Sequence, residues 1–133
     1  MGPSRVSQNE TQLWHILGKL GMATRIKNLP LGLDTPLRQI HTLLSAGEIQ
    51  MLCIARTLLR ISSYRVLICD EITANLDAGN EKVVQEIILD LEITVFFVCH
   101  KFSFISSCDR VMVLEEGKVV EFDSALNVHL HNS

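Results

Sequence analysis

The amino-acid sequence predicts an α/β fold, and two observations support this prediction. Residues 66–69 and 94–99 are short apolar runs of strand length, typical of parallel strands that are covered on both faces. Between them, residues 78–91 repeat apolar side chains at helical spacing along one side of a helix. A strand, a helix and a second strand in this order form the basic unit of an α/β domain.

The N-terminal part of the chain is predicted to be helical. Residues 1–10 are polar, and we expect them to be disordered. A helical region follows over residues 11–62, with a breaker segment at residues 29–34. Within this region Ser45 is a good N-cap, and Glu48 three residues later completes a capping box for the longest predicted helix.

The C-terminal part, residues 63–133, holds the two apolar strands, the helix between them and a short helix after the second strand. Residues 111–114 and 118–122 are then predicted to form a hairpin, with its turn at residues 115–117.

Composition excludes several classes of protein. The chain has 133 residues, of which 47% are hydrophobic, enough for one modest domain with a core. The net charge of −3 comes without a long basic run, so nucleic acid is not an expected partner. The longest apolar run is too short to cross a bilayer, and the N-terminus lacks the apolar region of a signal peptide. The four cysteines show no CxxC spacing, which favours reduced, buried thiols over a zinc site.

The helix that begins after Ser45 is the first candidate for chemistry. The first turn of a helix leaves backbone N–H groups unpaired, and the helix dipole favours an anion there. Gly47 lets a phosphate approach the backbone closely. The alternative is an ordinary capped helix, and spacing alone favours that alternative.

About twenty residues later, an apolar strand ends in Asp70 and Glu71. A phosphate-facing helix followed by a buried strand with two terminal carboxylates is the layout of nucleotide hydrolysis. The next strand ends at His100. Taken singly, the carboxylates could cap the following turn, and the histidine could be a hydrogen-bonded surface residue.

In order and at this spacing, these residues resemble the second half of the ATPase domain of ATP-binding-cassette (ABC) proteins. Residues 44–47 resemble the signature motif, residues 66–71 the Walker B strand, residues 73–77 the D-loop, and His100 the switch histidine. The fold that this implies is a partial P-loop NTPase (RecA-like) parallel sheet with flanking helices, plus a remnant of the ABC helical subdomain.

The resemblance also implies cofactors and roles. Ser45 and Gly47 would contact the γ-phosphate of ATP held by a partner domain, and Asp70 would hold Mg²⁺ through water. Glu71 would act as the general base toward water. His100 would sense the γ-phosphate, and Asp77 would anchor the D-loop at a domain interface. Because Glu48 replaces the usual glutamine and Ile49 a usual basic residue, contact with ATP is expected to be weakened.

The first half of such a domain is missing. A P-loop reads GxxxxGK[ST], and the candidate Gly18-Lys19 has Leu13 in place of the first glycine and Leu20 in place of the hydroxyl residue. We therefore expect this chain alone to be inactive as an ATPase. We also expect the edge of residues 94–99 to lack a neighbouring strand, unless the remaining strands close the gap. The absent half would also have covered the faces of residues 66–69 and 94–99, so we expect several of their side chains to be exposed.

Three further segments resemble the C-subfamily (multidrug-resistance-associated) transporters, and in particular their second, C-terminal nucleotide-binding domain. They are residues 29–35, 50–56 and 109–123. The implied function is ATP hydrolysis coupled to transmembrane export. The implied partners are transmembrane domains and a second nucleotide-binding domain, at the cytoplasmic face of a membrane.

Two alternatives stay open. The chain could be a truncated, non-catalytic cytoplasmic remnant that at most docks on another cassette and supplies the signature motif in trans. It could also have no biochemical function, as the product of a decayed gene.

Overall fold

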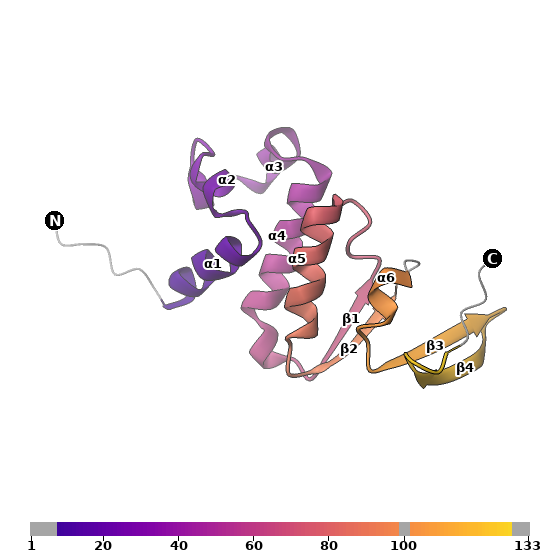
Figure 1. The fold of residues 1–133 in the computed structure, drawn as a ribbon. Helices are drawn as coiled ribbons and strands as arrows, with labels where there is room; N and C mark the ends of the chain where they lie inside the picture. The colour runs from indigo at the N-terminus through magenta and orange to yellow at the C-terminus, as the bar shows by residue number, and fades with distance from the viewer. Residues whose placement is uncertain (1–7, 99–101, 129–133) are drawn as a thin grey trace.

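A computed structural model describes residues 8–98 and 102–128 (Figure 1). Its elements run in the order α1 (Gln8–Lys19), α2 (Ala23–Lys27), η1 (Gly32–Asp34), α3 (Leu37–Leu43), α4 (Ala46–Leu59), η2 (Ile61–Ser63), β1 (Val66–Asp70), α5 (Ala78–Leu89), β2 (Thr94–Val98), α6 (Phe102–Ile105), β3 (Arg110–Glu115) and β4 (Lys118–Ser124). The predicted α/β fold is confirmed. Residues 8–10, which we expected to be disordered, form the first turn of α1, and residues 1–7 lie outside the described residues.

Helix α4 lies at the centre of the core. Its buried side chains repeat at intervals of three and four residues and so share one helix face: Met51, Ile54, Ala55 and Leu58. This face belongs to one continuous cluster that includes Leu17 of α1, Cys69 of β1 and Val84 of α5. The N-terminal helices and the strand–helix–strand unit are therefore packed around the same helix.

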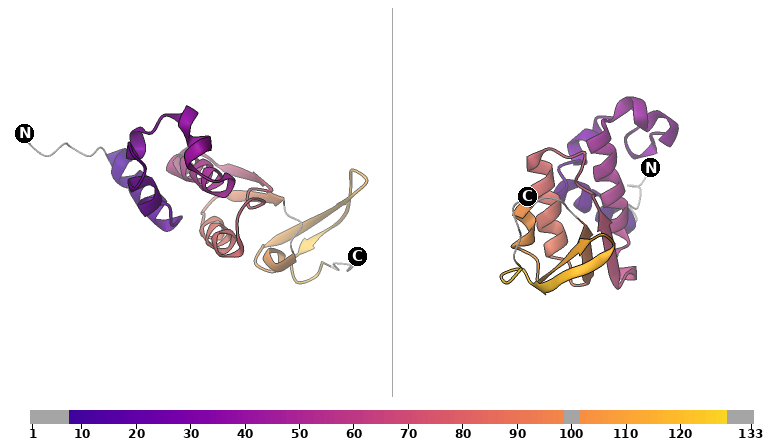
Figure 2. Two further views of the ribbon diagram at one scale, coloured as in Figure 1. Left: turned by 90° about the horizontal axis from the view of Figure 1, so that it is seen from above. Right: turned by 90° about the vertical axis from the view of Figure 1, so that its right-hand side faces the viewer.

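The strands form two separate two-stranded sheets. Strands β1 and β2 are parallel, with Val66 opposite Thr94 and Asp70 opposite Val98. Strands β3 and β4 form the predicted antiparallel hairpin, which turns at Glu116 and Gly117, both at positive φ (48° and 76°). Figures 1 and 2 place this hairpin at the opposite end of the molecule from α1. Across the described residues, β2 pairs with β1 and with no other strand, so the gap has not closed.

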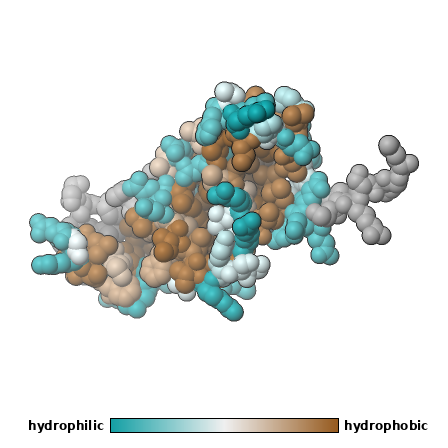
Figure 3. Space-filling view, turned by 180° about the vertical axis from the view of Figure 1, so that it is seen from behind, coloured by the Kyte–Doolittle hydropathy of each residue, from teal (hydrophilic) through white to brown (hydrophobic). Residues whose placement is uncertain are grey.

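One face of the β1–β2 sheet is covered and the other is bare, so the expectation that several side chains of these strands stay exposed is confirmed. Helices α4 and α5 cover one face, where Cys69 is buried and Phe97 half-buried (Figure 1). The other face is apolar and exposed: Val66 is 50%, Ile68 71%, Phe96 55% and Val98 47% accessible. Figure 3, seen from behind, shows apolar side chains gathered on that side. Apolar runs of this kind indicate side chains suited to burial on both faces, and this chain supplies only one layer of helices.

The cysteines are less uniform than we expected. Cys69 is buried, Cys108 half-buried and Cys53 exposed, while Cys99 lies outside the described residues. Burial raises the pKa of the Cys69 thiol to about 11, so this group stays protonated near neutral pH. In the part of the chain that the structure describes, no helix is long and apolar enough to span a membrane.

The exposed sheet face generates the first prediction. An apolar face beside an open strand edge associates readily with other chains, so the wild-type chain should be oligomeric or aggregated. The double substitution Ile68→Lys and Phe96→Lys should shift it toward monomer in light scattering, because charged side chains oppose association of this face. The control is Leu126→Lys, at a side chain that is 94% exposed and outside the sheet, which should change little. A monodisperse wild-type monomer with a sharp thermal melt would contradict this prediction.

Candidate functional site

The N-terminus of α4 carries the predicted capping box. The Glu48 N–H donates to Ser45 Oγ at 3.2 Å, and the Ser45 N–H donates to Glu48 Oε2 at 2.8 Å. These two bonds leave the N–H groups of Ala46 and Gly47, which have no partner within a helix, for water or a ligand. The helix dipole places partial positive charge at the same end.

Glu48 also pairs with Arg25. The Arg25 Nε donates to Glu48 Oε1 at 2.7 Å, and its Nη2 donates to the Leu43 carbonyl at 2.5 Å. The hydrogen bond from the Ser45 backbone, followed by that from Arg25, lowers the pKa of the Glu48 carboxyl. The acidic residue that replaces the usual glutamine is therefore ionised and charge-balanced. No local pattern predicts this pair, because 23 residues separate its members.

The two predicted carboxylates lie at the carboxyl end of β1. Asp70 and Glu71 are both exposed. Glu71 has a φ of +48°, and its N–H donates to the Val98 carbonyl at the end of β2 at 3.2 Å. Ligands of parallel α/β sheets bind at this end of the strands. His100, the predicted switch histidine, lies outside the described residues.

The loop over residues 71–77 connects β1 to α5 and is held by its own hydrogen bonds. The Ala74 N–H donates to the Glu71 carbonyl at 3.0 Å, and the buried Thr73 hydroxyl donates to Glu81 Oε1 at 3.2 Å. Asp77 is the N-cap of α5, where its Oδ1 accepts from the Asn80 N–H at 2.9 Å. That bond lowers the pKa of the Asp77 carboxyl. The Asp77 side chain therefore caps α5, as the Ser45 side chain caps α4.

Helix α4 contacts this loop through Gly47 and Gln50. A Cβ added at Gly47 would lie 2.7 Å from the Asn75 carbonyl oxygen, so only glycine permits this contact. The Gln50 Nε2 donates to the Ile72 carbonyl at 2.5 Å, and its Oε1 accepts from Asn75 Nδ2 at 2.9 Å. The sequence predicts Gly47 as a point where a phosphate approaches the backbone, and no motif in it indicates these contacts of Gln50. The one available signal was that Gly47 and Gln50 are three residues apart and so share a helix face.

These segments line an open cavity of about 600 Å³ between the N-termini of α4 and α5. Three predicted site residues, Ser45, Gly47 and Asp77, line it together with Asn75. Asp70 and Glu71 are not among the lining residues. The structure thus brings the predicted signature motif and D-loop together at one cavity, and places the predicted Walker B carboxylates at the strand end where the loop begins.

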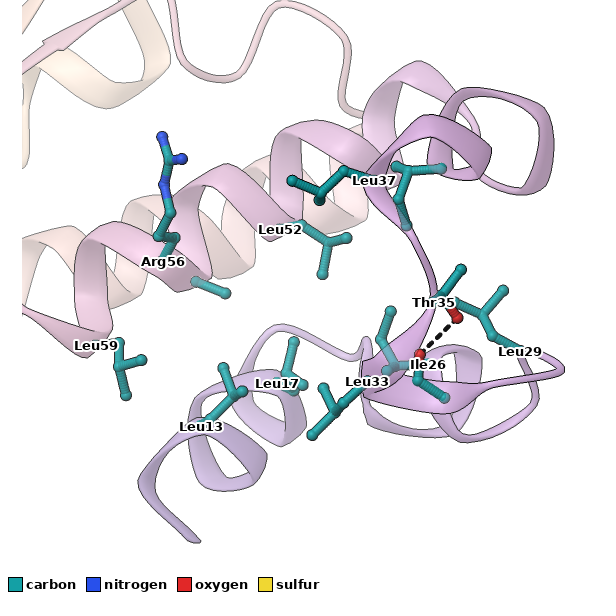
Figure 4. Close-up of a pocket in the computed structure, with 13 residues that line it drawn as sticks. Leu13, Leu17, Ile26, Leu29, Leu33, Thr35, Leu37, Leu52, Arg56 and Leu59 are labelled. Atoms are coloured by element: carbon teal, nitrogen blue, oxygen red, sulfur yellow. Dashed lines mark hydrogen bonds between the residues drawn. The ribbon is translucent and has the colours of Figure 1, made fainter. Parts of the chain in front are cut away.

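A second cavity, of about 280 Å³, lies among the N-terminal helices and α4 (Figure 4). Its lining is mostly leucine, with the Arg56 side chain beside it and the Thr35 hydroxyl donating to the Gly32 carbonyl at 2.7 Å. None of the predicted site residues lines this cavity.

The residues present fit part of a nucleotide site. Across residues 8–98 and 102–128, no three His, Cys, Asp or Glu side chains gather as a metal site requires. An exposed carboxylate at a strand end, such as Asp70, does suit Mg²⁺, which keeps several of its waters and takes one or two carboxylates. The N–H groups at the start of α4 suit an anion.

Comparisons with known proteins agree with this fold. No protein-family model matches the chain. A solved structure of a bacterial Atm1-family ABC exporter with ATP bound superposes with a TM-score of 0.75 and 29% sequence identity, over 95% of this chain and 22% of that one. The chain therefore has the fold of a fragment of an ABC exporter's nucleotide-binding domain.

Sequence relatives point to the same class. The chain is 36% identical over 115 residues to the multidrug resistance-like ATP-binding protein MdlB of Buchnera aphidicola, covering 85% of this chain and 20% of that protein. It is 33% identical over 116 residues to ATP-binding cassette sub-family C member 4 of Mus musculus, covering 86% and 9%. The homologues of this chain are ABC transporters, C-subfamily members included, and the chain spans a small part of each.

The close contact at Gly47 generates the second prediction. Gly47→Ala should lower the free energy of unfolding by about 1–3 kcal/mol, because the new methyl group overlaps the Asn75 carbonyl. Gly18→Ala in α1 is the control, since an added Cβ meets nothing within 4 Å there. That change should raise stability by about 0.5–1 kcal/mol. Urea unfolding of the Ile68→Lys/Phe96→Lys background measures both, and equal effects of the two changes would refute the contact.

The Arg25–Glu48 pair generates the third prediction. Folding lowers the pKa of Glu48 below 4.5, so its contribution to stability is present above pH 4.5 and is lost as the pH falls through the folded-state pKa. Glu48→Gln keeps a capping residue but removes the charge. The stability difference between the parent and this variant, measured by urea unfolding, should therefore shrink below pH 4.5. A difference that stays constant with pH would show that the ion pair contributes nothing.

Proposed function

We propose that this chain is the C-terminal half of an ATP-hydrolysing nucleotide-binding domain of an ABC exporter, of the second-cassette, C-subfamily type. The observation that carries the proposal is the cavity between α4 and α5, where the signature-like turn at Ser45 and Gly47 meets the D-loop-like residues that end at Asp77. The homology to ABC transporters supports it. In this arrangement the domain works at the cytoplasmic face of a membrane, with transmembrane domains and a second cassette as partners.

Each residue has a role in this proposal. Ser45 and the free N–H groups of Ala46 and Gly47 recognise the γ-phosphate of an ATP molecule held by the partner cassette. Asp70 is the carboxylate for Mg²⁺, and Glu71 accepts a proton from the attacking water. His100 senses the γ-phosphate, and Asp77 anchors the D-loop. ATP supplies the phosphoryl group whose release drives transport.

The exposed face of the β1–β2 sheet supports the proposal that a further layer belongs on this chain. Four apolar side chains that are about half exposed or more, next to the open edge of β2, fit a layer formed by the N-terminal half of a cassette. Covering such side chains contributes up to roughly 1.5–3 kcal/mol each. That sum is comparable with the whole stability of a domain, about 5–15 kcal/mol. Assembly with that half is therefore part of the proposal.

The alternative is a non-catalytic remnant that docks on an intact cassette and supplies Ser45 and Gly47 in trans. It is favoured by one observation: the capping box, the Arg25–Glu48 pair and the Gln50 contacts all lie within this chain. The turn that faces the phosphate is therefore formed without the missing half.

The fourth prediction separates these functions. The chain alone should bind a fluorescent ATP analogue with Mg²⁺ no better than millimolar and should show no ATPase activity, because nothing holds the nucleotide against Glu71. Co-expression with the N-terminal half of a C-subfamily cassette should restore turnover. In that assembly Glu71→Gln should reduce turnover by about 10²–10⁴-fold.

Two experimental outcomes would contradict the proposed catalytic function or favour its alternative. Saturable binding in the low micromolar range by the chain alone would show that the missing half is not needed to hold ATP. ATP-dependent association with an intact cassette, without turnover in any assembly, would favour the non-catalytic remnant.

A further inference from the structure

Glu71 has an unfavourable backbone conformation. Its φ of +48° lies in the left-handed region, where the Cβ of an L-residue crowds the following carbonyl. Strain of this kind persists only where the surrounding structure holds it in place, and such positions gather at functional sites. Contacts with neighbouring elements must therefore hold Glu71 in this conformation.

Three hydrogen bonds fix the backbone around Glu71. Its N–H donates to the Val98 carbonyl of β2 at 3.2 Å, and its carbonyl accepts from the Ala74 N–H at 3.0 Å. The next carbonyl, that of Ile72, accepts from the Gln50 side chain at 2.5 Å. The first two bonds lie within the sheet and the loop, and the third comes from a different element, α4.

Gln50 uses both ends of its amide on this loop. Its nitrogen donates to Ile72, and its oxygen accepts from Asn75 Nδ2 at 2.9 Å. One turn earlier on the same helix, Gly47 lies against the Asn75 carbonyl. Gln50 is half-buried, where a neutral amide is cheaper to desolvate than a charge. A carboxylate could accept from Asn75 but could not donate to Ile72, and a leucine could do neither.

We propose that Gln50 is a positioning residue that holds the turn at residues 71–75, and so fixes the place of the Glu71 carboxylate relative to the N-terminus of α4. The proposal rests on the proposed role of Glu71 as the base. Its consequence is that the signature-like turn and the base are carried by one rigid unit, because residues 45–50 and 71–75 are joined through Gln50 and Gly47. A shift of α4 then moves both.

Hydrogen exchange in the full chain tests the positioning directly. Gln50→Leu should raise exchange in a peptide spanning residues 71–76 by about tenfold or more, since two hydrogen bonds are lost. Gln50→Glu should also raise exchange at neutral pH, because its carboxylate can still accept from Asn75 but has no proton to donate to the Ile72 carbonyl. Thr57→Val is the matched control on α4: it removes the bond from Thr57 Oγ1 to the Cys53 carbonyl and should leave this peptide unchanged.

A second change tests the link to backbone strain. Glycine adopts positive φ freely, so in a Glu71→Gly background the loop needs less support. The effect of Gln50→Leu on exchange should then shrink. Unchanged exchange of residues 71–76 in Gln50→Leu would overturn the proposal, and so would an equal effect in both backgrounds.

Turnover in the assembly with the N-terminal half tests the consequence for Glu71. Gln50→Leu should lower kcat by about tenfold or more with little change in the KM for ATP, because the base is displaced while the nucleotide is held elsewhere. Wild-type kcat in this variant, per assembled complex, would overturn the proposal. If the wild-type assembly shows no turnover, the proposed function fails, whereas the exchange results decide the positioning by themselves.

Discussion

The packing of α4 against its neighbours is the constraint on which the rest of the structure depends. Its buried face, which includes Met51 and Ala55, joins α1 to the strand–helix–strand unit in one core cluster. Its N-terminus is fixed by the capping box and by Arg25, and its first turns hold the loop after β1 through Gly47 and Gln50. One helix therefore sets the core, the anion-facing turn and the loop that carries the predicted carboxylates.

The sheet beside α4 is only half enclosed. Cys69 is buried against the helices, while Ile68, the residue before it, is 71% exposed. In a covered parallel sheet both would be buried, because both faces carry helices. Small domains already bury a low fraction of their surface, so a sheet with one bare face leaves little margin of stability. The loop at the end of β1 is held by hydrogen bonds within this chain, whereas the sheet that carries it leaves one apolar face exposed.

The sequence predicted what local patterns determine. The capping box at Ser45 and Glu48, the two apolar strands and the hairpin turn at Gly117 follow from short-range rules, and the structure has them. The contacts of Arg25 with Glu48 and of Gln50 with Ile72 and Asn75 join residues 22–25 apart, which no local pattern specifies. The exposure of the sheet was expected because part of the domain is absent, but the sequence did not specify which face stays bare. An apolar run indicates suitability for burial, and tertiary neighbours decide where burial occurs.

The charges around the α4–α5 cavity decide how a phosphate can be recognised there. Glu48 and Asp77 both line it as cap residues with lowered pKa, and none of the described lining residues is basic. Arg25 is already paired with Glu48. Two N–H bonds to an anion and a helix dipole amount to roughly 3–7 kcal/mol. Immobilising a free ligand costs about 4–15 kcal/mol, which offsets most or all of this gain. We therefore expect the turn at Ser45 to bind a free phosphate weakly and to recognise one best where another protein surface holds the nucleotide, as the proposed recognition in trans requires.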